Sequence, residues 1–363
     1  MDYQPTQSGP VQQAPQPGAV PPQGWQPPVY VPVQAPGGIP QPVYYYMPVQ
    51  DRRVKNGAKT FNRMSLVTLL QFLMAFAVEL PLITALTMMG TDIYQDQMLL
   101  TLLEGAMVPL STALPFVLVM FLSRQPASEY LKFRKTDKVQ SLLLVVAALG
   151  LVLAANLPAG WLQDIMSQGG YSPTPQVTEM TSMPLFLAEF AITAILVPIM
   201  EEFAFRGVLL SRLERHGEVF ALVGSAILFS LAHMDASTVV FAFAAGLVFG
   251  FLYMRTRNLW VSIAVHALNN GLAVIGSAAD LLFPQEAMDV AEFCMFYLPI
   301  ALGVVALVLL LAFKRKVFLT PLQQEVPTVR PLTFGESVQA YIRAPMFWVF
   351  LGMSILFTVG QFF

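Results

Sequence analysis

Ionisable side chains are concentrated in one apolar stretch of the sequence, between residues 185 and 276. This stretch holds the adjacent carboxylates of Glu201 and Glu202, then Arg206, His233 and His266. A carboxylate beside an imidazole can hold a water molecule and accept its proton, and general-base chemistry of this kind accelerates reactions by about 10²–10⁴-fold. Because an ionisable group inside an apolar segment is costly, each of these residues needs a partner or a function.

Helical spacing separates the roles of the two neighbouring glutamates. Glu202 and Arg206 are four residues apart, so they share one helix face and can form an ion pair. Glu201 lies about 100° round the helix from Glu202 and is free to face elsewhere. His266 and Asn270 are also four residues apart, so both project from one face of a later helix, where they can donate hydrogen bonds to an oxyanion.

The depth of these residues follows from a predicted turn at His216 and Gly217. Glu202 lies 15 residues before Gly217, and His233 lies 16 residues after it. In an antiparallel hairpin both then lie roughly 22–24 Å from the turn, at 1.5 Å of rise per residue. The helix that carries His233 is therefore expected to be short and to end at mid-depth. We expect three helices to present an acid, an imidazole, and an imidazole–amide pair to one buried water.

The residue types favour attack by water over a covalent nucleophile. The single cysteine, Cys294, is remote in sequence, and no serine lies in a nucleophile-elbow pattern. One glutamate with two histidines is also a zinc ligand set, but the sequence lacks an HExxH motif. We therefore predict no cofactor and leave zinc open. A buried polar network that only stabilises the bundle is the non-catalytic alternative, and helix–helix hydrogen bonding is the simplest role for Glu79 and Glu104.

Composition sets the class of protein that must position these groups. The chain has 363 residues, of which 56% are hydrophobic and only 12% are charged. An average soluble domain has about 25% charged residues, and the mean hydropathy here is +0.61. A soluble enzyme and a wholly disordered chain are both excluded, and the net charge of −2 gives no sign of nucleic-acid binding.

Nine apolar runs of the length that spans a bilayer follow residue 60. They lie near residues 64–87, 99–122, 141–162, 185–200, 219–233, 237–254, 258–276, 293–313 and 347–363. The runs are continuous rather than alternating, which favours helices over strands. In lipid every backbone polar group must be bonded within the protein. We predict an all-α, polytopic transmembrane helical bundle with about nine spans.

The loops between the runs alternate in charge. Basic residues lie in segments 52–63, 124–138, 206–215, 255–257 and 314–316, whereas the intervening loops have none. Cytoplasmic loops carry the excess of Lys and Arg. We therefore expect an integral protein of the cell membrane with its N-terminus in the cytoplasm and its C-terminus outside.

The chain divides into four parts by composition. Residues 1–50 contain 13 of the 28 prolines and many glutamines, which predicts a disordered Pro/Gln-rich tail. Residues 51–183 are expected to form N-terminal transmembrane helices, residues 184–283 the catalytic core, and residues 284–363 C-terminal transmembrane helices. Residues 27–30 of the tail fit a short proline–tyrosine pattern that WW modules bind, but we favour a plain low-complexity tether, since such tetrapeptides arise easily in this composition.

Three short motifs of the core, in this order, resemble a known family. Residues 201–206 match EExxxR, residues 229–233 match FxxxH, and residues 266–270 match HxxxN. Together in membrane helices they are similar to the motifs of the CAAX-protease and bacteriocin-processing (CPBP, or Abi) family of intramembrane glutamic endopeptidases. The resemblance covers residues 185–276 and implies an eight-helix-type core with a glutamate protease site.

The resemblance also implies roles for individual residues. Glu201 would be the base that activates water, assisted by His233, and His266 with Asn270 would form the oxyanion site. It further implies a metal-free mechanism. Three residues would support this geometry: Glu202, Arg206 and Phe229.

These inferences lead to one function and its rivals. We predict an intramembrane endopeptidase that hydrolyses a peptide bond of a membrane-associated or lipidated peptide, with the bilayer and that peptide as its partners and no nucleic acid. A transporter or proton relay would also use buried Glu and His in a helical bundle. A non-catalytic peptide-binding or bacteriocin-immunity protein is the third hypothesis.

Overall fold

The computed structural model describes residues 29–32, 42–45, 52–91, 96–171, 180–319 and 330–362. The chain forms two units, residues 1–52 and residues 53–363. In the first unit, strands β1 (Val29–Pro32) and β2 (Pro42–Tyr45) pair in antiparallel fashion. The predicted disordered tail falls on this unit, and apart from the two strands it lies outside the described residues.

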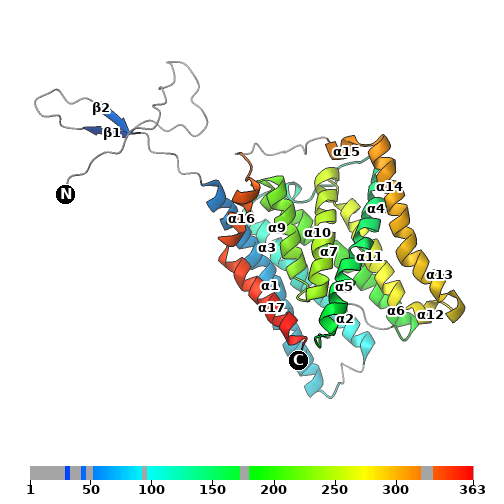
Figure 1. Cartoon of the computed structure of the whole chain (residues 1–363). Coiled ribbons are helices and arrows are strands. Elements are labelled where there is room, and N and C mark those ends of the chain that lie inside the picture. The colour runs from blue at the N-terminus through cyan, green and yellow to red at the C-terminus, as the bar shows by residue number, and fades with distance from the viewer. Residues whose placement is uncertain are drawn as a thin grey trace, which may run out of the picture. The chain divides into compact units, whose positions relative to one another are not determined.

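The second unit is a bundle of helices, as the apolar runs predict (Figure 1). The α-helices of its described residues are α1 (Arg53–Met88), α2 (Gln97–Val108), α3 (Leu114–Ser123), α4 (Lys138–Ala154), α5 (Asn156–Ser167), α6 (Met183–Glu189), α7 (Val197–Glu202), α8 (Ser211–Glu214), α9 (Glu218–Leu231), α10 (Ala236–Thr256), α11 (Leu259–Ser277), α12 (Ala279–Leu282), α13 (Met288–Glu292), α14 (Leu298–Phe313), α15 (Lys316–Leu319), α16 (Phe334–Ile342) and α17 (Pro345–Gly360). Short 3₁₀ turns η2 (Ala127–Glu129) and η5 (Gln285–Ala287) lie between some of them.

Seven of the described helical segments are long and apolar enough to cross a membrane, and the count becomes eight if α16 and α17, bent by 73°, form one span. The polytopic all-α bundle is therefore confirmed, and the predicted number of about nine spans is close. The difference lies in the short apolar helices: α9 has only 14 residues, so it ends partway through the bundle, as the position of His233 predicts.

Four π-helical segments interrupt the described helices: η1 (Pro109–Ala113), η3 (Phe190–Leu196), η4 (Phe203–Leu210) and η6 (Phe293–Tyr297). Three of them are followed by a helix whose second residue is a proline: Pro115, Pro198 and Pro299. Proline has no backbone N–H, so it cannot supply the next bond of the helical ladder. The wider π register forms just before the residue that lacks this donor.

Close approach of glycines joins helices that are far apart in sequence. A Cβ atom added to Gly303 of α14 would lie 2.7 Å from the Cα atom of Gly150 in α4. The backbones of these two helices therefore touch, and neither position has room for a side chain. On the other side of the bundle, α1, α9 and α16 are joined by aromatic contacts: Phe220 stacks on Tyr341, and Phe61 packs edge-on or tilted against both rings.

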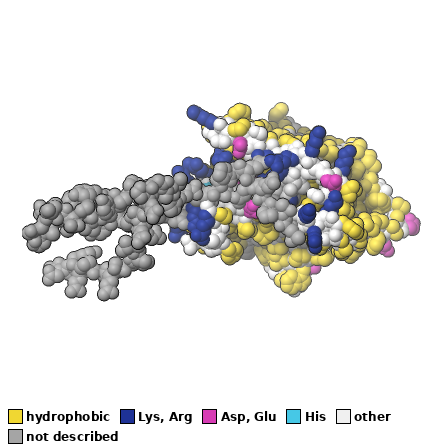
Figure 2. Space-filling model, turned by 90° about the horizontal axis from the view of Figure 1, so that it is seen from above, with side chains coloured by type: hydrophobic (Ala, Val, Ile, Leu, Met, Phe, Trp, Pro, Cys, Tyr) yellow, Lys and Arg dark blue, Asp and Glu magenta, His cyan; other side chains and the backbone are white. Residues whose placement is uncertain are grey.

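The basic segments gather at one end of the bundle. Figure 2 looks onto this end and shows Lys and Arg side chains around it. Bonds across it connect the segments: Arg257 pairs with Glu214, and Lys314 lies 3.8 Å from Asp137. We call this end the basic face.

Candidate active site

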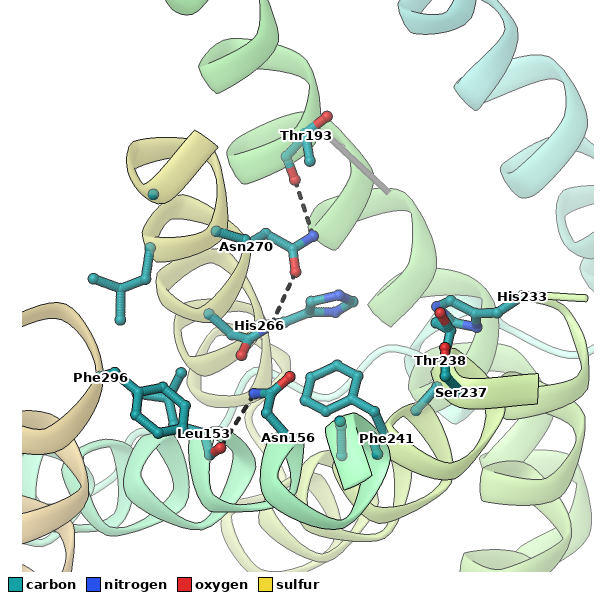
Figure 3. Close-up of a pocket in the computed structure, with 18 of the residues that line it drawn as sticks. Leu153, Asn156, Thr193, His233, Ser237, Thr238, Phe241, His266, Asn270 and Phe296 are labelled. Carbon is teal, nitrogen blue, oxygen red and sulfur yellow. Dashed lines mark hydrogen bonds between the residues drawn. The ribbon is translucent and has the colours of Figure 1, made fainter. Parts of the chain in front are cut away.

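A cavity of about 790 Å³ lies among α4, α5, α7, α10, α11 and the segments η3 and η6 (Figure 3). Four of the residues predicted to be catalytic line it: Glu201, His233, His266 and Asn270. They come from α7, the loop after α9, and α11, which are the three segments that the hairpin arithmetic brings together. The structure therefore places the predicted acid, both imidazoles and the amide around one space.

The two adjacent glutamates have different surroundings. The side chain of Glu202 is 0% exposed, and its Oε1 accepts hydrogen bonds from Arg206 at 2.7 Å and from His266 Nδ1 at 3.0 Å. The side chain of Glu201 is 19% exposed and lines the cavity, with Oε2 3.6 Å from His266 Nε2. The predicted ion pair of Glu202 is present, and Glu201 is the carboxylate that a ligand in the cavity can reach.

Aromatic rings enclose the guanidinium of Arg206, which is 1% exposed. Its carbon lies 4.2 Å from the ring centre of Phe229 and 5.0 Å from that of Phe249, and Nη2 donates to the carbonyl of Gly246. A desolvated cation over such rings gains cation–π attraction. Phe249 also stacks on the His266 ring, with 4.8 Å between centres. Phe229 thus contacts Arg206, and its supporting role stays a prediction. No sequence signal marked Phe249.

The ring of His233 has a defined hydrogen-bonding state. Its Nδ1 lies 3.0 Å from the carbonyl oxygen of Phe229. A carbonyl only accepts, so Nδ1 carries a proton, and Nε2 is the ring nitrogen that can offer a lone pair. In the part of the chain that the structure describes, His233 forms no ion pair with Glu201, and the imidazole next to that carboxylate is His266. Both residues line the same cavity.

Asp235 holds the loop that carries His233, a role the sequence reasoning missed. Asp235 caps α10 by accepting from the Thr238 N–H at 2.9 Å and the Ser237 hydroxyl at 2.8 Å, and Tyr171 donates its phenol proton to the other oxygen. Burial alone raises the pKa of Asp235, but these hydrogen bonds outweigh it and bring the pKa below its ordinary value. An Asp directly before an apolar helix is a capping signal that could have revealed this residue.

The amide of Asn270 is held at both ends. Its Nδ2 donates to the backbone carbonyl of Thr193 at 3.0 Å, and its Oδ1 accepts from Asn269 at 3.2 Å (Figure 3). The hydroxyl of Thr193 donates in turn to the buried carboxylate of Glu189 at 2.6 Å. Thr193 also lines the cavity and was not marked by any sequence pattern.

The candidate metal ligands are the His, Cys, Asp and Glu side chains. Among the described residues, no group of three or more of them is arranged to hold a metal ion. Glu202 Oε2 is buried and, within the same residues, has no hydrogen-bond partner. The expectation of a cofactor-free site stays a prediction.

The cavity is apolar along much of its wall and has one exposed end. Phe241, Leu272 and Phe296 contribute apolar surface, which suits a hydrophobic peptide segment. His266 is buried, whereas Gln163 and Gly276 are exposed. Both lie near the C-terminal ends of α5 and α11. These ends are remote from the basic face, because α11 begins beside Arg257 and the continuous segment formed by α4 and α5 begins at Lys138. The cavity therefore runs from mid-depth toward the end opposite the basic face.

Comparisons with known proteins find similarity to membrane peptidases. The model of the family described as type II CAAX prenyl endopeptidase Rce1-like matches residues 183–272, which contain all three motifs. YdiL of Bacillus subtilis (strain 168), a candidate membrane peptidase by its name, is 29% identical over 164 residues, which are 44% of this chain and 66% of YdiL. The membrane-embedded CAAX protease MroQ of Staphylococcus aureus (strain USA300) is 28% identical over 135 residues, which are 34% of this chain and 52% of MroQ. No solved structure gave a significant match.

The matches place the similarity to membrane peptidases in the core of the chain. Residues 183–272, which carry the three motifs, are similar to the CAAX-protease and bacteriocin-processing (CPBP) family. The matches cover 66% of the length of YdiL and 52% of that of MroQ. The helices before α6 and after α11 lie outside the family match.

Proposed function

We propose that the protein is an intramembrane endopeptidase in which Glu201 and His233 activate a water molecule to hydrolyse a peptide bond. One observation carries the proposal: a carboxylate, two imidazoles and an amide from separate segments line a single cavity inside the helical bundle. The family match to peptidases supports it. The substrate class is a membrane-associated or lipidated peptide, since the cavity lies among lipid-facing helices and has an apolar wall.

The geometry around Glu201 suits a bound water. The 3.6 Å between Glu201 Oε2 and His266 Nε2 is too long for a direct hydrogen bond. A water molecule that contacts both atoms fits this separation. On attack, the water oxygen bonds to the peptide carbon and its proton passes to Glu201, with the His233 Nε2 lone pair as a second acceptor. The C–N bond then breaks, and the departing nitrogen takes the proton.

The developing oxyanion needs hydrogen-bond donors. We assign this role to the amide of Asn270 and to the ring of His266, whose Nε2 donates when both ring nitrogens carry a proton, because Nδ1 donates to Glu202. Donors that are already oriented stabilise such a charge without reorganisation. Glu202 contributes indirectly, because it accepts from His266 Nδ1 and thereby orients the ring, while Arg206 neutralises the charge of Glu202.

We further propose that the basic face lies in the cytoplasm, with the N-terminus on the same side, in the cell membrane. The exposed end of the cavity is then on the non-cytoplasmic side, so substrates enter from there. Single cysteines test this in a Cys294→Ser background. In intact cells a membrane-impermeant maleimide should label Gln163→Cys and not Lys135→Cys on the basic face. The reverse pattern would contradict the orientation.

A cleavage assay tests the enzyme itself. Purified protein in detergent is incubated with a panel of prenylated and unmodified apolar peptides, with and without a chelator, beside the Glu201→Gln variant. Cleavage by wild type alone supports the proposal, and loss with chelator would assign a metal. Peptide binding without cleavage would favour the binding or immunity hypothesis. Ion flux in liposomes without cleavage would favour a transporter.

A further inference from the structure

The backbone carbonyl of Thr193 accepts a hydrogen bond from Asn270 and receives none from a backbone N–H of its own helix. This observation gives two further residues a role in the site. We infer that Thr193 and Pro198 are positioning residues: Pro198 withholds the backbone N–H that would occupy the Thr193 carbonyl, and the free carbonyl orients the Asn270 amide in the cavity. The inference rests on the proposed function, in which Asn270 donates to the oxyanion.

The register of η3 explains why the carbonyl is free. At the end of this π-helical segment the Val197 N–H bonds to the carbonyl of Ile192, five residues earlier. The next donor in this register would be residue 198, directed at Thr193, but residue 198 is proline and has no N–H. A buried carbonyl without a partner is costly. The side-chain Nδ2 of Asn270 takes the place of the missing donor, at 3.0 Å.

This arrangement fixes which end of the amide faces which neighbour. The Thr193 carbonyl can only accept, so it must meet Nδ2 and not Oδ1 of Asn270. Oδ1 is occupied by the Asn269 amide at 3.2 Å. With both ends bonded, the amide plane cannot flip. One proton of Nδ2 remains for a ligand in the cavity that Asn270 lines.

The side chain of Thr193 anchors the same turn independently of its carbonyl. Its hydroxyl donates to Glu189 at 2.6 Å, and Glu189 is buried one turn earlier in α6. This contact gives a structural role to the buried carboxylate of Glu189, which takes no part in the proposed hydrolysis. It also separates two functions of Thr193, since substitution of the hydroxyl leaves the backbone carbonyl in place.

Pro198→Ala tests the inference, with Pro115→Ala as a matched control. Both prolines are buried second residues of α-helices that follow a π-helical segment, but Pro115 does not line the cavity and precedes no residue that does within its own helix. The new N–H of Pro198→Ala competes for the Thr193 carbonyl and releases Asn270. Loss of a whole oxyanion donor costs about 10²–10³-fold in kcat. We expect a roughly tenfold lower kcat, since the amide is misplaced but not removed, with KM unchanged, and wild-type kcat for Pro115→Ala.

A double variant distinguishes positioning from general damage. In an Asn270→Ala background, Pro198→Ala should cause no further loss of kcat, because the group that it positions is absent. A further loss by the same factor as in the wild-type background would overturn the inference. Equal loss in Pro115→Ala would also overturn it, since any proline removal would then suffice.

An NMR measurement tests the hydrogen bond between Asn270 and the Thr193 carbonyl independently of enzymatic activity. In protein labelled with ¹⁵N-asparagine in detergent, the Nδ2 resonances of Asn270 are assigned by their loss in Asn270→Asp. They should shift in Pro198→Ala and stay in place in Pro115→Ala, and an unshifted resonance in Pro198→Ala would overturn the inference. If wild type cleaves no peptide, the proposed function fails, while this measurement still tests the hydrogen bond.

Discussion

The inner helices α10 and α11 differ from the outer helices α1 and α14 in what holds them in place. About half of the apolar window of the inner helices is buried in the protein (50% and 44%), against 17% for the segments that contain α1 and α14. The inner helices carry His266 and Asn270 and contact Arg206, whereas α14 presents residues such as Val304, 59% exposed, outward. Polar chemistry is placed where neighbouring helices exclude lipid.

The two regions also use different packing forces. The inner region is joined by a charged, hydrogen-bonded network in which Glu202, Arg206 and His266 are mutually dependent. The outer region is joined by shape, as at Gly150 and Gly303, where backbones touch. Removing one charged group from the network should destabilise the inner region, whereas adding a side chain to a close helix–helix contact should destabilise the outer region. Four predictions test this difference.

The largest effect is expected at Glu201. Glu201→Gln keeps the size of the side chain but cannot accept a proton, so the rate of peptide cleavage should fall by about 10²–10⁴-fold. The measurement is the initial rate with purified protein in detergent. Glu129→Gln, an exposed carboxylate on the basic face, is the control and should retain the wild-type rate. Cleavage by Glu201→Gln at near the wild-type rate would remove this residue from the chemistry.

Glu202→Gln should damage the fold more than Glu201→Gln does. It leaves the buried cation of Arg206 without its counter-charge, and breaking a buried pair typically costs roughly 3–5 kcal/mol. The free energy of unfolding in mixed detergent, measured by titration with a denaturing detergent, should therefore fall for Glu202→Gln. Glu201→Gln is the neighbouring control, because its carboxylate is partly exposed. Equal stability of the two variants would show that the network does not depend on Glu202.

In the outer region, adding a side chain at a close-packed glycine should lower the free energy of unfolding more than shortening an exposed side chain does. Gly303→Val places methyl groups against the backbone of Gly150, and overpacking costs about 1–3 kcal/mol. Val304→Ala, at an adjacent exposed position, should change the free energy of unfolding by less than about 0.5 kcal/mol. Thermal unfolding in detergent measures both. A tolerated Gly303→Val would mean that α4 and α14 do not pack as closely as described.

The smallest effect concerns the basic face. His216 lies outside the spanning helices, and burial, followed by the charge of Arg215, lowers its pKa from the ordinary 6.5. The unfolded chain then binds a proton that the folded protein resists, so stability present above pH 6.5 is lost as the pH falls toward the lowered pKa. The melting temperature should fall more steeply with acidification in wild type than in His216→Gln. Parallel curves would exclude this residue as the cause.

Much of the architecture could be predicted because it follows from local patterns. The apolar runs coincide with helices, and the turn at His216 and Gly217 occurs where it was placed, with Gly217 at a φ of +135°. The ion pair of Glu202 and Arg206 is a consequence of four-residue spacing on one helix. Such features depend on neighbours in sequence, and periodicity records them directly.

Other features depend on contacts between distant segments and could not be predicted in this way. The imidazole beside Glu201 is that of His266, while His233 bonds to Phe229. Asp235 receives the phenol of Tyr171 from a different loop. The π-helical segments also escape a search for regular periodicity, since they widen the helix locally where a proline and a packed neighbour require it.

The amino-acid sequence alone determined that this is a helical membrane protein with a Glu, His and Asn constellation at one depth, because hydrophobicity and helical rise act residue by residue. Only the tertiary structure decided which imidazole meets which carboxylate, which end of the bundle the cavity opens toward, and which carbonyl holds Asn270. Those outcomes depend on how helices rotate against one another, and that rotation is set by packing over the whole bundle.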